Sequence, residues 1–159
     1  ENERGGSCFA PRLLQGIAEL EHLAKNQPSG VNGAMAKDPR FRDRLARARL
    51  DAEALEVTEL RILAELAKGR QPGPQTSLCK LLGSNIGQTL DTLRLDLLGY
   101  DGLQLPPERP LYGNEAPEPV GTERAQTAMA RYLNNRASTI FGGSDETQKN
   151  IIAKSVLGL

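Results

Sequence analysis

A run of about thirty residues with helical periodicity, from Asp38 to Lys68, most limits how this chain can fold. Asp38 followed by Pro39 is a typical helix start, because aspartate caps the first N–H groups and proline fits the first turn. A helix this long buries its apolar side only against other long helices, so the run predicts a helix bundle. The apolar positions form one main stripe (Leu45, Ala48, Ala52, Leu55, Ile62, Leu66) and a second stripe near the end (Leu60, Leu63, Ala67).

Other segments with the same periodicity are separated by breaks rich in glycine and proline. The first helix is expected to start near Pro11, and the fourth at Thr122. The third is expected to be capped by Thr76 or Ser77 and to carry an apolar stripe that includes Leu78 and Leu82. No strand pattern and no internal repeat is present. We therefore predict an all-α fold, an up-and-down four-helix bundle whose last helix leads into a helix-turn-helix tail.

Two local patterns refine this prediction. Gly83 and Gly87 lie four residues apart in the third helix, which predicts that a neighbouring helix approaches closely there. The start of the long helix is rich in arginine, and Asp43 and Asp51 alternate with these arginines. This mixture is typical of a solvated face with ion pairs rather than of a phosphate-binding site.

Composition excludes several classes of function. The chain has 20 basic and 20 acidic residues, so there is no positive field for nucleic acid or an anionic membrane. His22 is the only histidine, and Cys8 and Cys79 lack metal-ligand spacing, so no metal site is expected. Buried structural cysteines are the favoured interpretation of both thiols. No apolar run is long enough to span a membrane, and no signal peptide is recognised, so we expect a cytoplasmic protein.

The C-terminal segment contains the most specific motif. Gly142-Gly143 is expected to end one helix, and Ser144 then occupies the position of an N-cap. Asp145 and Glu146 follow in the first turn, where the helix dipole favours acidic groups. Ile151, Ile152, Val156 and Leu159 form an apolar stripe on this last helix.

Thr139-Ile-Phe-Gly-Gly-Ser-Asp-Glu-Thr-Gln148 and the helix that follows resemble the C-terminal signature of acyl-CoA dehydrogenases. Asn2-Glu-Arg-Gly-Gly6, and the segment from Ser77-Leu-Cys-Lys80 to Leu97-Leu-Gly-Tyr100, are also similar to that family. The resemblance implies that residues 1–159 are the C-terminal helical domain of a longer flavoprotein. The N-terminal helical domain and the middle β-domain would then be missing, and this stretch alone is expected to be inactive.

The resemblance also implies a reaction, the α,β-dehydrogenation of an acyl-CoA thioester in fatty acid metabolism. A carboxylate removes the α-proton, and FAD accepts the hydride. In many relatives the base is a Glu just before the first glycine of the signature turn, where this chain has Gly142. Some relatives supply the base from a Glu-Arg pair at the start of this domain, and Glu3 before Arg4 matches that pair. Glu3 is therefore the candidate catalytic residue, although the sequence also allows an exposed acid there or a base outside this stretch.

The candidate FAD contacts implied by the resemblance are Gly142, Gly143, Ser144 and Glu146 in the turn, and Gly99 at the end of the third helix. Two features depart from the family. The Arg-x-x-Phe-Gly motif at the start of the second helix is absent, and Gly99 stands where relatives often have two glycines. No FAD contact is carried over to the second helix.

The implied partners are an acyl-CoA substrate, electron-transfer flavoprotein as electron acceptor, and other subunits. The resemblance favours a homodimer or homotetramer, or a hetero-oligomer in which this chain is a non-catalytic subunit without its own base. An acyl-CoA oxidase has the same fold and stays open as an alternative. A helical interaction module unrelated to flavin is the remaining interpretation.

Overall fold

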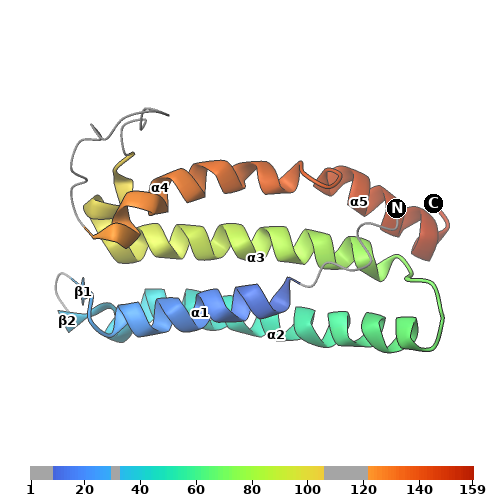
Figure 1. Ribbon diagram of the computed structural model, residues 1–159, viewed down its shortest axis with the longest axis horizontal. Coiled ribbons are helices and arrows are strands. Elements are labelled where there is room, and N and C mark those ends of the chain that lie inside the picture. The colour runs from blue at the N-terminus through green and yellow to red at the C-terminus, as the bar shows by residue number, and fades with distance from the viewer. Residues whose placement is uncertain (1–8, 30–32, 106–121) are drawn as a thin grey trace, which may run out of the picture.

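The computed structural model describes residues 9–29, 33–105 and 122–159, with the backbone alone for Glu123. Its helices run up and down along one long axis, and α3 lies between the α1–α2 pair and the line formed by α4 and α5 (Figure 1). The predicted all-α fold is confirmed. The helices are α1 (Ala10–Ala24), α2 (Pro39–Ala67), α3 (Gln75–Leu98), α4 (Glu123–Asn135) and α5 (Asp145–Ile152).

One prediction about secondary structure is wrong, because the α1–α2 connection contains two short strands. β1 (Pro28–Ser29) pairs antiparallel with β2 (Gly33–Ala34). Strands of two residues are held by backbone hydrogen bonds and are too short to show the alternation that identifies a strand in a sequence. The remaining short elements are the 3-10 turns η2 (Met35–Lys37), η3 (Gly99–Leu103) and η4 (Arg136–Thr139), and the π turn η5 (Ala153–Leu157).

The hydrophobic core lies where α1, α2 and α3 meet. Each helix contributes apolar residues at intervals of three or four positions, which places them on one face. Ile17, Leu20, Leu55 and Leu93 are fully buried there. Cys79 is also buried in this core, as expected, while Cys8 lies outside the described residues.

The predicted helix starts are mostly confirmed. The Asp38 carboxylate accepts hydrogen bonds from the N–H groups of Arg40 and Phe41, both at 2.9 Å, and the Thr122 hydroxyl accepts one from Ala125 at 3.3 Å. The prediction for α3 is wrong, because this helix begins at Gln75 without a side-chain cap. Pro74 already has helical backbone angles, and the Thr76 hydroxyl instead donates to the Gly73 carbonyl at 3.1 Å.

Several apolar positions are more exposed than their periodicity predicts. The core stripe of α2 ends at Leu55, and Ile62 and Leu66 are only partly buried. In α3, Leu78 is exposed and Leu82 is only partly buried. At the C-terminus Val156 and Leu159 are exposed, while Ile151 and Ile152 are half-buried. Periodicity marks the apolar face of a helix but does not say whether the same chain covers that face.

The arginine-rich face at the start of α2 forms ion pairs, as expected. Arg47 contacts Asp43 within the helix at 3.0 Å, and Arg49 contacts Glu21 of α1 at 2.9 Å. Arg44 pairs with Asp96 of α3. These side chains are largely exposed, so each pair contributes at most about 1 kcal/mol to stability.

A buried carboxylate that the sequence analysis missed joins α2 to the start of α1. The Glu59 carboxylate accepts hydrogen bonds from the N–H of Phe9 at 2.7 Å and of Ala10 at 3.2 Å. Phe9 precedes the first turn of α1, where N–H groups have no partner within the helix and the dipole favours an anion. Glu59 therefore caps a helix about fifty residues earlier in the sequence.

Only one of the two α3 glycines is required by packing. A Cβ added at Gly83 would lie 2.6 Å from Cγ of Phe9, closer than van der Waals contact permits. At Gly87 the nearest atom would be Nδ2 of Asn135 at 3.6 Å, an ordinary contact. The close approach predicted from this glycine pair is therefore real at Gly83, where an aromatic ring rather than a helix backbone is the neighbour.

This difference predicts opposite effects for two identical substitutions. Gly83→Ala should lower the free energy of unfolding by about 1–3 kcal/mol, because the Phe9 ring must move. Gly87→Ala should leave it unchanged or raise it by up to about 1 kcal/mol, because alanine favours the helix and the space exists. Urea denaturation followed by circular dichroism measures both. Equal effects of the two changes would contradict the packing of Phe9 on Gly83.

Glu59 gives a second prediction about stability. Glu59→Ala should cost about 2 kcal/mol, since two N–H groups at the start of α1 lose their acceptor. Glu53→Ala, one to two turns earlier on the exposed side of α2, is the matched control and should change stability by less than about 0.5 kcal/mol. Thermal unfolding of both variants checks the difference, and a loss in Glu53→Ala as large as that in Glu59→Ala would argue against capping.

Candidate functional site

The glycine turn between η4 and α5 has the backbone geometry that the sequence predicts. Gly142 and Gly143 both have positive φ, +64° and +91°, which other residues adopt only with strain. Ser144 is the N-cap of α5, and its hydroxyl accepts a hydrogen bond from the N–H of Thr147 at 3.3 Å. The structure therefore brings Gly142, Gly143, Ser144 and Glu146 together in one turn followed by a helix N-terminus.

Glu146 lies in the first turn of α5 and is exposed to solvent. Its pKa is lowered first by a hydrogen bond from its own backbone N–H and then by one from Ser144. The positive charges of Lys149 and Lys80 lower it further. Glu146 is thus held as an anion and can accept hydrogen bonds, but it is a poor proton acceptor near neutral pH.

A buried ion pair anchors the start of α5 on α3. Nζ of Lys80 lies 2.8 Å from Oδ1 of Asp145, and both side chains are about nine-tenths buried. Lys80 stands among apolar residues of α3, and this charged residue at an inward-facing position was the signal available in the sequence. Lys80 belongs to the Ser77-Leu-Cys-Lys80 segment that resembles the family, but the sequence alone predicts no role for it.

Gln148 of α5 also contacts the glycine turn, and the sequence alone predicts no role for it. Its side chain is fully buried, and Nε2 donates to the carbonyl of Gly142 at 3.2 Å. Oε1 has no hydrogen-bond partner among the described residues. A buried acceptor without a donor costs roughly 1–3 kcal/mol, so this atom offers a place for an incoming hydrogen-bond donor.

Gly99 is not part of this turn. It has φ of +59° at the C-terminal end of α3, and its N–H donates to the carbonyl of Leu95. The turn instead lies over the N-terminal half of α3, beside Lys80 and Ser84. With a rise of 1.5 Å per residue, Gly99 lies roughly 22–29 Å from Ser84 and Lys80 along the axis of α3. One chain therefore presents two separate candidate contacts.

The candidate base Glu3 lies outside the described residues, upstream of Phe9. Phe9, the first described residue, packs on Gly83, and its N–H donates to the Glu59 carboxylate. Glu59 is itself a buried carboxylate, but it already accepts hydrogen bonds from Phe9 and Ala10. It is therefore engaged as a helix cap rather than available as a base.

A buried cluster around Asp91 holds α4 on α3. Asp91 is 2% exposed, and its two oxygens contact Nε of Arg131 at 2.9 Å, Nη1 of Arg94 at 3.2 Å and Nδ2 of Asn135 at 2.5 Å. Arg131 and Asn135 belong to α4, so this carboxylate binds two helices together. The cluster fixes the direction in which α4 leads to the glycine turn.

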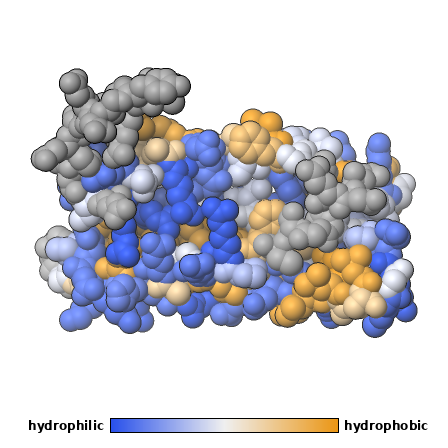
Figure 2. All heavy atoms as spheres, viewed as in Figure 1, coloured by the Kyte–Doolittle hydropathy of each residue, from blue (hydrophilic) through white to orange (hydrophobic). Residues whose placement is uncertain are grey.

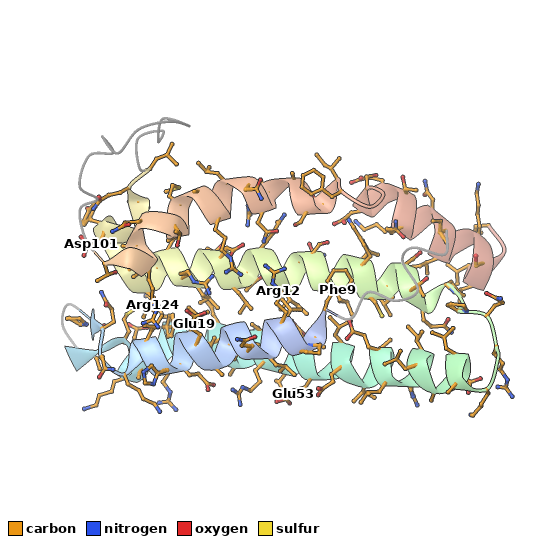
Figure 3. All side chains as sticks on the ribbon, in the orientation of Figure 1. Phe9, Arg12, Glu19, Glu53, Asp101 and Arg124 are labelled. Atoms are coloured by element: carbon orange, nitrogen blue, oxygen red, sulfur yellow. The ribbon has the colours of Figure 1, made fainter. Side chains whose placement is uncertain are left out.

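The cluster extends to α1 through Glu19. Its carboxylate contacts Nη2 of Arg94 at 3.3 Å and Nε of Arg124 at 3.7 Å, and Figure 3 shows Glu19 on α1 and Arg124 on α4 near the same end of the bundle. Burial lowers the pKa of Arg94, and the nearby charge of Arg131 lowers it further. The guanidinium stays protonated at physiological pH because arginine starts far above that range.

Among the described residues no group of three or more His, Cys, Asp or Glu side chains could hold a metal ion. No helix in the same part of the chain combines the length and apolarity needed to cross a membrane.

Comparison with known proteins gives a consistent result. The model of the acyl-CoA dehydrogenase C-terminal domain matches residues 2–157. Acyl-CoA dehydrogenase IpdE1 of Mycobacterium tuberculosis is 34% identical over 99% of this chain and 35% of its own length. IpdE1 of Mycolicibacterium smegmatis is 36% identical over 99% of this chain and 34% of its own length. The chain thus spans about a third of the length of these relatives.

Two further comparisons agree. Acyl-CoA dehydrogenase FadE34 of Mycobacterium tuberculosis is 34% identical over 88% of this chain and 16% of its own length. The crystal structure of the ChsE4-ChsE5 complex from Mycobacterium tuberculosis superposes with a TM-score of 0.70 at 22% identity. That superposition covers 96% of this chain and 36% of the other, and it supports the fold alone. The chain belongs to the acyl-CoA dehydrogenase family, in which it corresponds to the C-terminal helical domain.

Proposed function

We propose that this domain is part of a flavin-dependent enzyme that converts an acyl-CoA thioester to its α,β-unsaturated product. The family match over residues 2–157 is the observation that carries the proposal. The domain contributes FAD contacts, and electron-transfer flavoprotein then takes the electrons. Acyl-CoA oxidase activity is the competing outcome if oxygen reoxidises the flavin directly.

The glycine turn fits FAD as a ligand. Its glycines have positive φ, and Gln148 keeps a buried oxygen without a donor among the described residues. The first-turn N–H groups of Glu146 and Thr147 already donate to the Glu146 carboxylate and the Ser144 hydroxyl, so these two side chains would face the ligand in their place. Ser144 and Glu146 add a hydroxyl and a carboxylate at the same place. FAD supplies a hydride acceptor when bound, and the chain's own residues orient it and exclude water.

Gly99 serves a second flavin contact in this proposal. It lies roughly 22–29 Å along α3 from the residues that contact the turn, so the turn and Gly99 of one chain need not contact the same FAD molecule. A second subunit would explain the separation, with each chain contributing its turn to one flavin and the end of α3 to another. This arrangement supports an oligomer over a monomer.

We assign the base to Glu3. Glu3→Gln keeps the shape of the side chain but removes the proton acceptor, so FAD and acyl-CoA should still bind. Flavin reduction should slow at least about a hundredfold, the low end for losing a general base. Anaerobic mixing of the full-length FAD-loaded protein with acyl-CoA measures this as bleaching of the flavin absorbance.

The matched control for this experiment is Glu53→Gln, an exposed glutamate on α2 that should leave the rate unchanged. Reduction of Glu3→Gln at the wild-type rate would overturn the assignment. Gly142→Glu in the Glu3→Gln background tests the other position for a base. Any recovery there should be small, because φ of +64° costs a non-glycine residue about 1–2 kcal/mol.

The second candidate function is a non-catalytic subunit of a heteromeric dehydrogenase. The backbone of Gly142 favours it, since this position in the turn is adapted to glycine rather than to a glutamate. The structural relative is itself a complex of two named proteins. Dehydrogenation by the purified full-length chain without a partner would favour the catalytic role, and activity only after mixing with a second subunit would favour this one.

The second half of α2 is our proposed subunit contact. Figure 2 shows a hydrophobic patch over this part of the helix, where Val57, Leu60 and Leu63 are 55%, 59% and 43% exposed. Monomers rarely leave neighbouring large apolar residues on one helix uncovered. The preferred partner is another copy of the chain, giving a dimer or tetramer.

Charges placed in this patch should weaken assembly. Leu60→Lys together with Leu63→Lys should raise the dissociation constant of the full-length oligomer at least about tenfold, or about 1.4 kcal/mol. Leu133→Lys, which replaces a half-exposed leucine on α4, is the control and should change little. Sedimentation velocity across a concentration series measures the constant. A wild-type protein that stays monomeric at high concentration would contradict the proposal.

A further inference from the structure

The glycine turn is anchored at both ends to one face of α3. Lys80, Ser84 and Gln88 are spaced four residues apart, so their side chains project on the same side of the helix. The Ser84 hydroxyl donates to the carbonyl of Ser138 at 3.2 Å, just before the turn. Lys80 holds Asp145 at 2.8 Å, just after it. The backbone of the turn is thus tied to α3 on both sides.

The spacing of these two points determines the path of the turn. Ser84 and Lys80 are about 6 Å apart along the axis of α3, whereas the chain from Ser138 to Asp145 is several times longer when extended. The intervening residues take up this extra length in the compact end of η4 and in the glycine turn. Phe141 is 61% exposed, and Gly142 follows it with positive φ.

The two sides of the turn are not held equally. Before the turn, Nε2 of Gln88 contacts the carbonyl of Asn135 at 3.0 Å and Oγ of Ser138 at 3.1 Å, in addition to the bond from Ser84. After the turn, the Lys80–Asp145 pair makes the side-chain link from this face to the first residue of α5. Loss of one bond before the turn leaves others in place, while loss of Lys80 removes the ion pair at the first residue of α5.

Burial makes the Lys80–Asp145 link sensitive to change. Asp145 is favoured as an anion at the N-terminus of α5, and only about a tenth of its surface is exposed, so removing Lys80 would leave a buried carboxylate without its cation. An unpaired buried charge is costly, so the start of α5 would then move to let water reach the carboxylate. That movement would displace Ser144 and Glu146, which flank Asp145 in the sequence.

We propose that Lys80 is a positioning residue for flavin binding, which acts through Asp145 to hold the glycine turn in its binding geometry. The inference rests on the proposed function, in which this turn contacts FAD. It gives a role to the lysine of the Ser77-Leu-Cys-Lys80 segment, and that role is to orient the turn rather than to contact the reacting atoms.

The experiment compares Lys80→Met and Asp145→Asn in the full-length protein. Each should weaken FAD binding at least about tenfold in a fluorescence titration, because each breaks the same pair. The double variant should bind FAD no more weakly than the single variant with the lower FAD affinity, since the two residues act as one unit. Lys154→Met, which removes an exposed lysine from η5, is the matched control and should bind FAD within about twofold of wild type.

Two further readouts separate positioning from general loss of structure. Hydrogen exchange of Lys80→Met should rise at residues 139–152 and stay unchanged in α1 and α2. The visible circular dichroism of bound flavin should change in Lys80→Met but not in Lys154→Met. Faster exchange throughout the bundle would overturn the inference in favour of a purely structural role.

The outcomes also separate this inference from the proposed function. If the wild-type protein binds FAD and Lys80→Met binds it equally well, the positioning role is overturned and the flavin proposal stands. If the wild-type protein fails to bind FAD under any subunit composition tested, both fall.

Discussion

The two-sided character of α3 is the constraint on which the rest of the structure depends. One side carries Ile86, Leu90, Leu93 and Leu97, which are buried against α1 and α2. The other carries Lys80, Ser84, Gln88 and Asp91, which hydrogen-bond to the segment from α4 to α5. The apolar side of α3 therefore holds α1 and α2 by hydrophobic burial. Its polar side holds the segment from α4 to α5 by hydrogen bonds and ion pairs.

The difference matters because apolar contact is non-directional while hydrogen bonds and ion pairs require geometry. The apolar side holds α1 and α2 close without requiring one orientation of each side chain. The polar side specifies which backbone carbonyl and which carboxylate of the tail lie opposite each residue of α3. Hydrogen bonds and ion pairs suit the proposed FAD-binding turn, since a shift of about 1 Å is enough to impair a functional site.

The start of α1 is also held by both kinds of contact, a directional hydrogen bond and side-chain packing. Glu59 of α2 caps α1, and Phe9 packs on Gly83 of α3, so α2 and α3 both contact the first turn of α1. Our proposed base, Glu3, lies just upstream of this turn in the sequence.

The sequence by itself determined the helices, the caps at Asp38, Thr122 and Ser144, and the family, because these depend on local periodicity, turn chemistry and motif wording. Only the tertiary structure decided which residues of different helices contact one another. It assigned Glu59 to the start of α1 and Lys80 to Asp145, contacts between residues about fifty and sixty-five positions apart. It also showed that Val156 and Leu159 stay exposed despite their spacing. A helical period identifies a face of one helix, but the partner of a buried charge is set by how separate helices pack, and that information is spread over the whole chain.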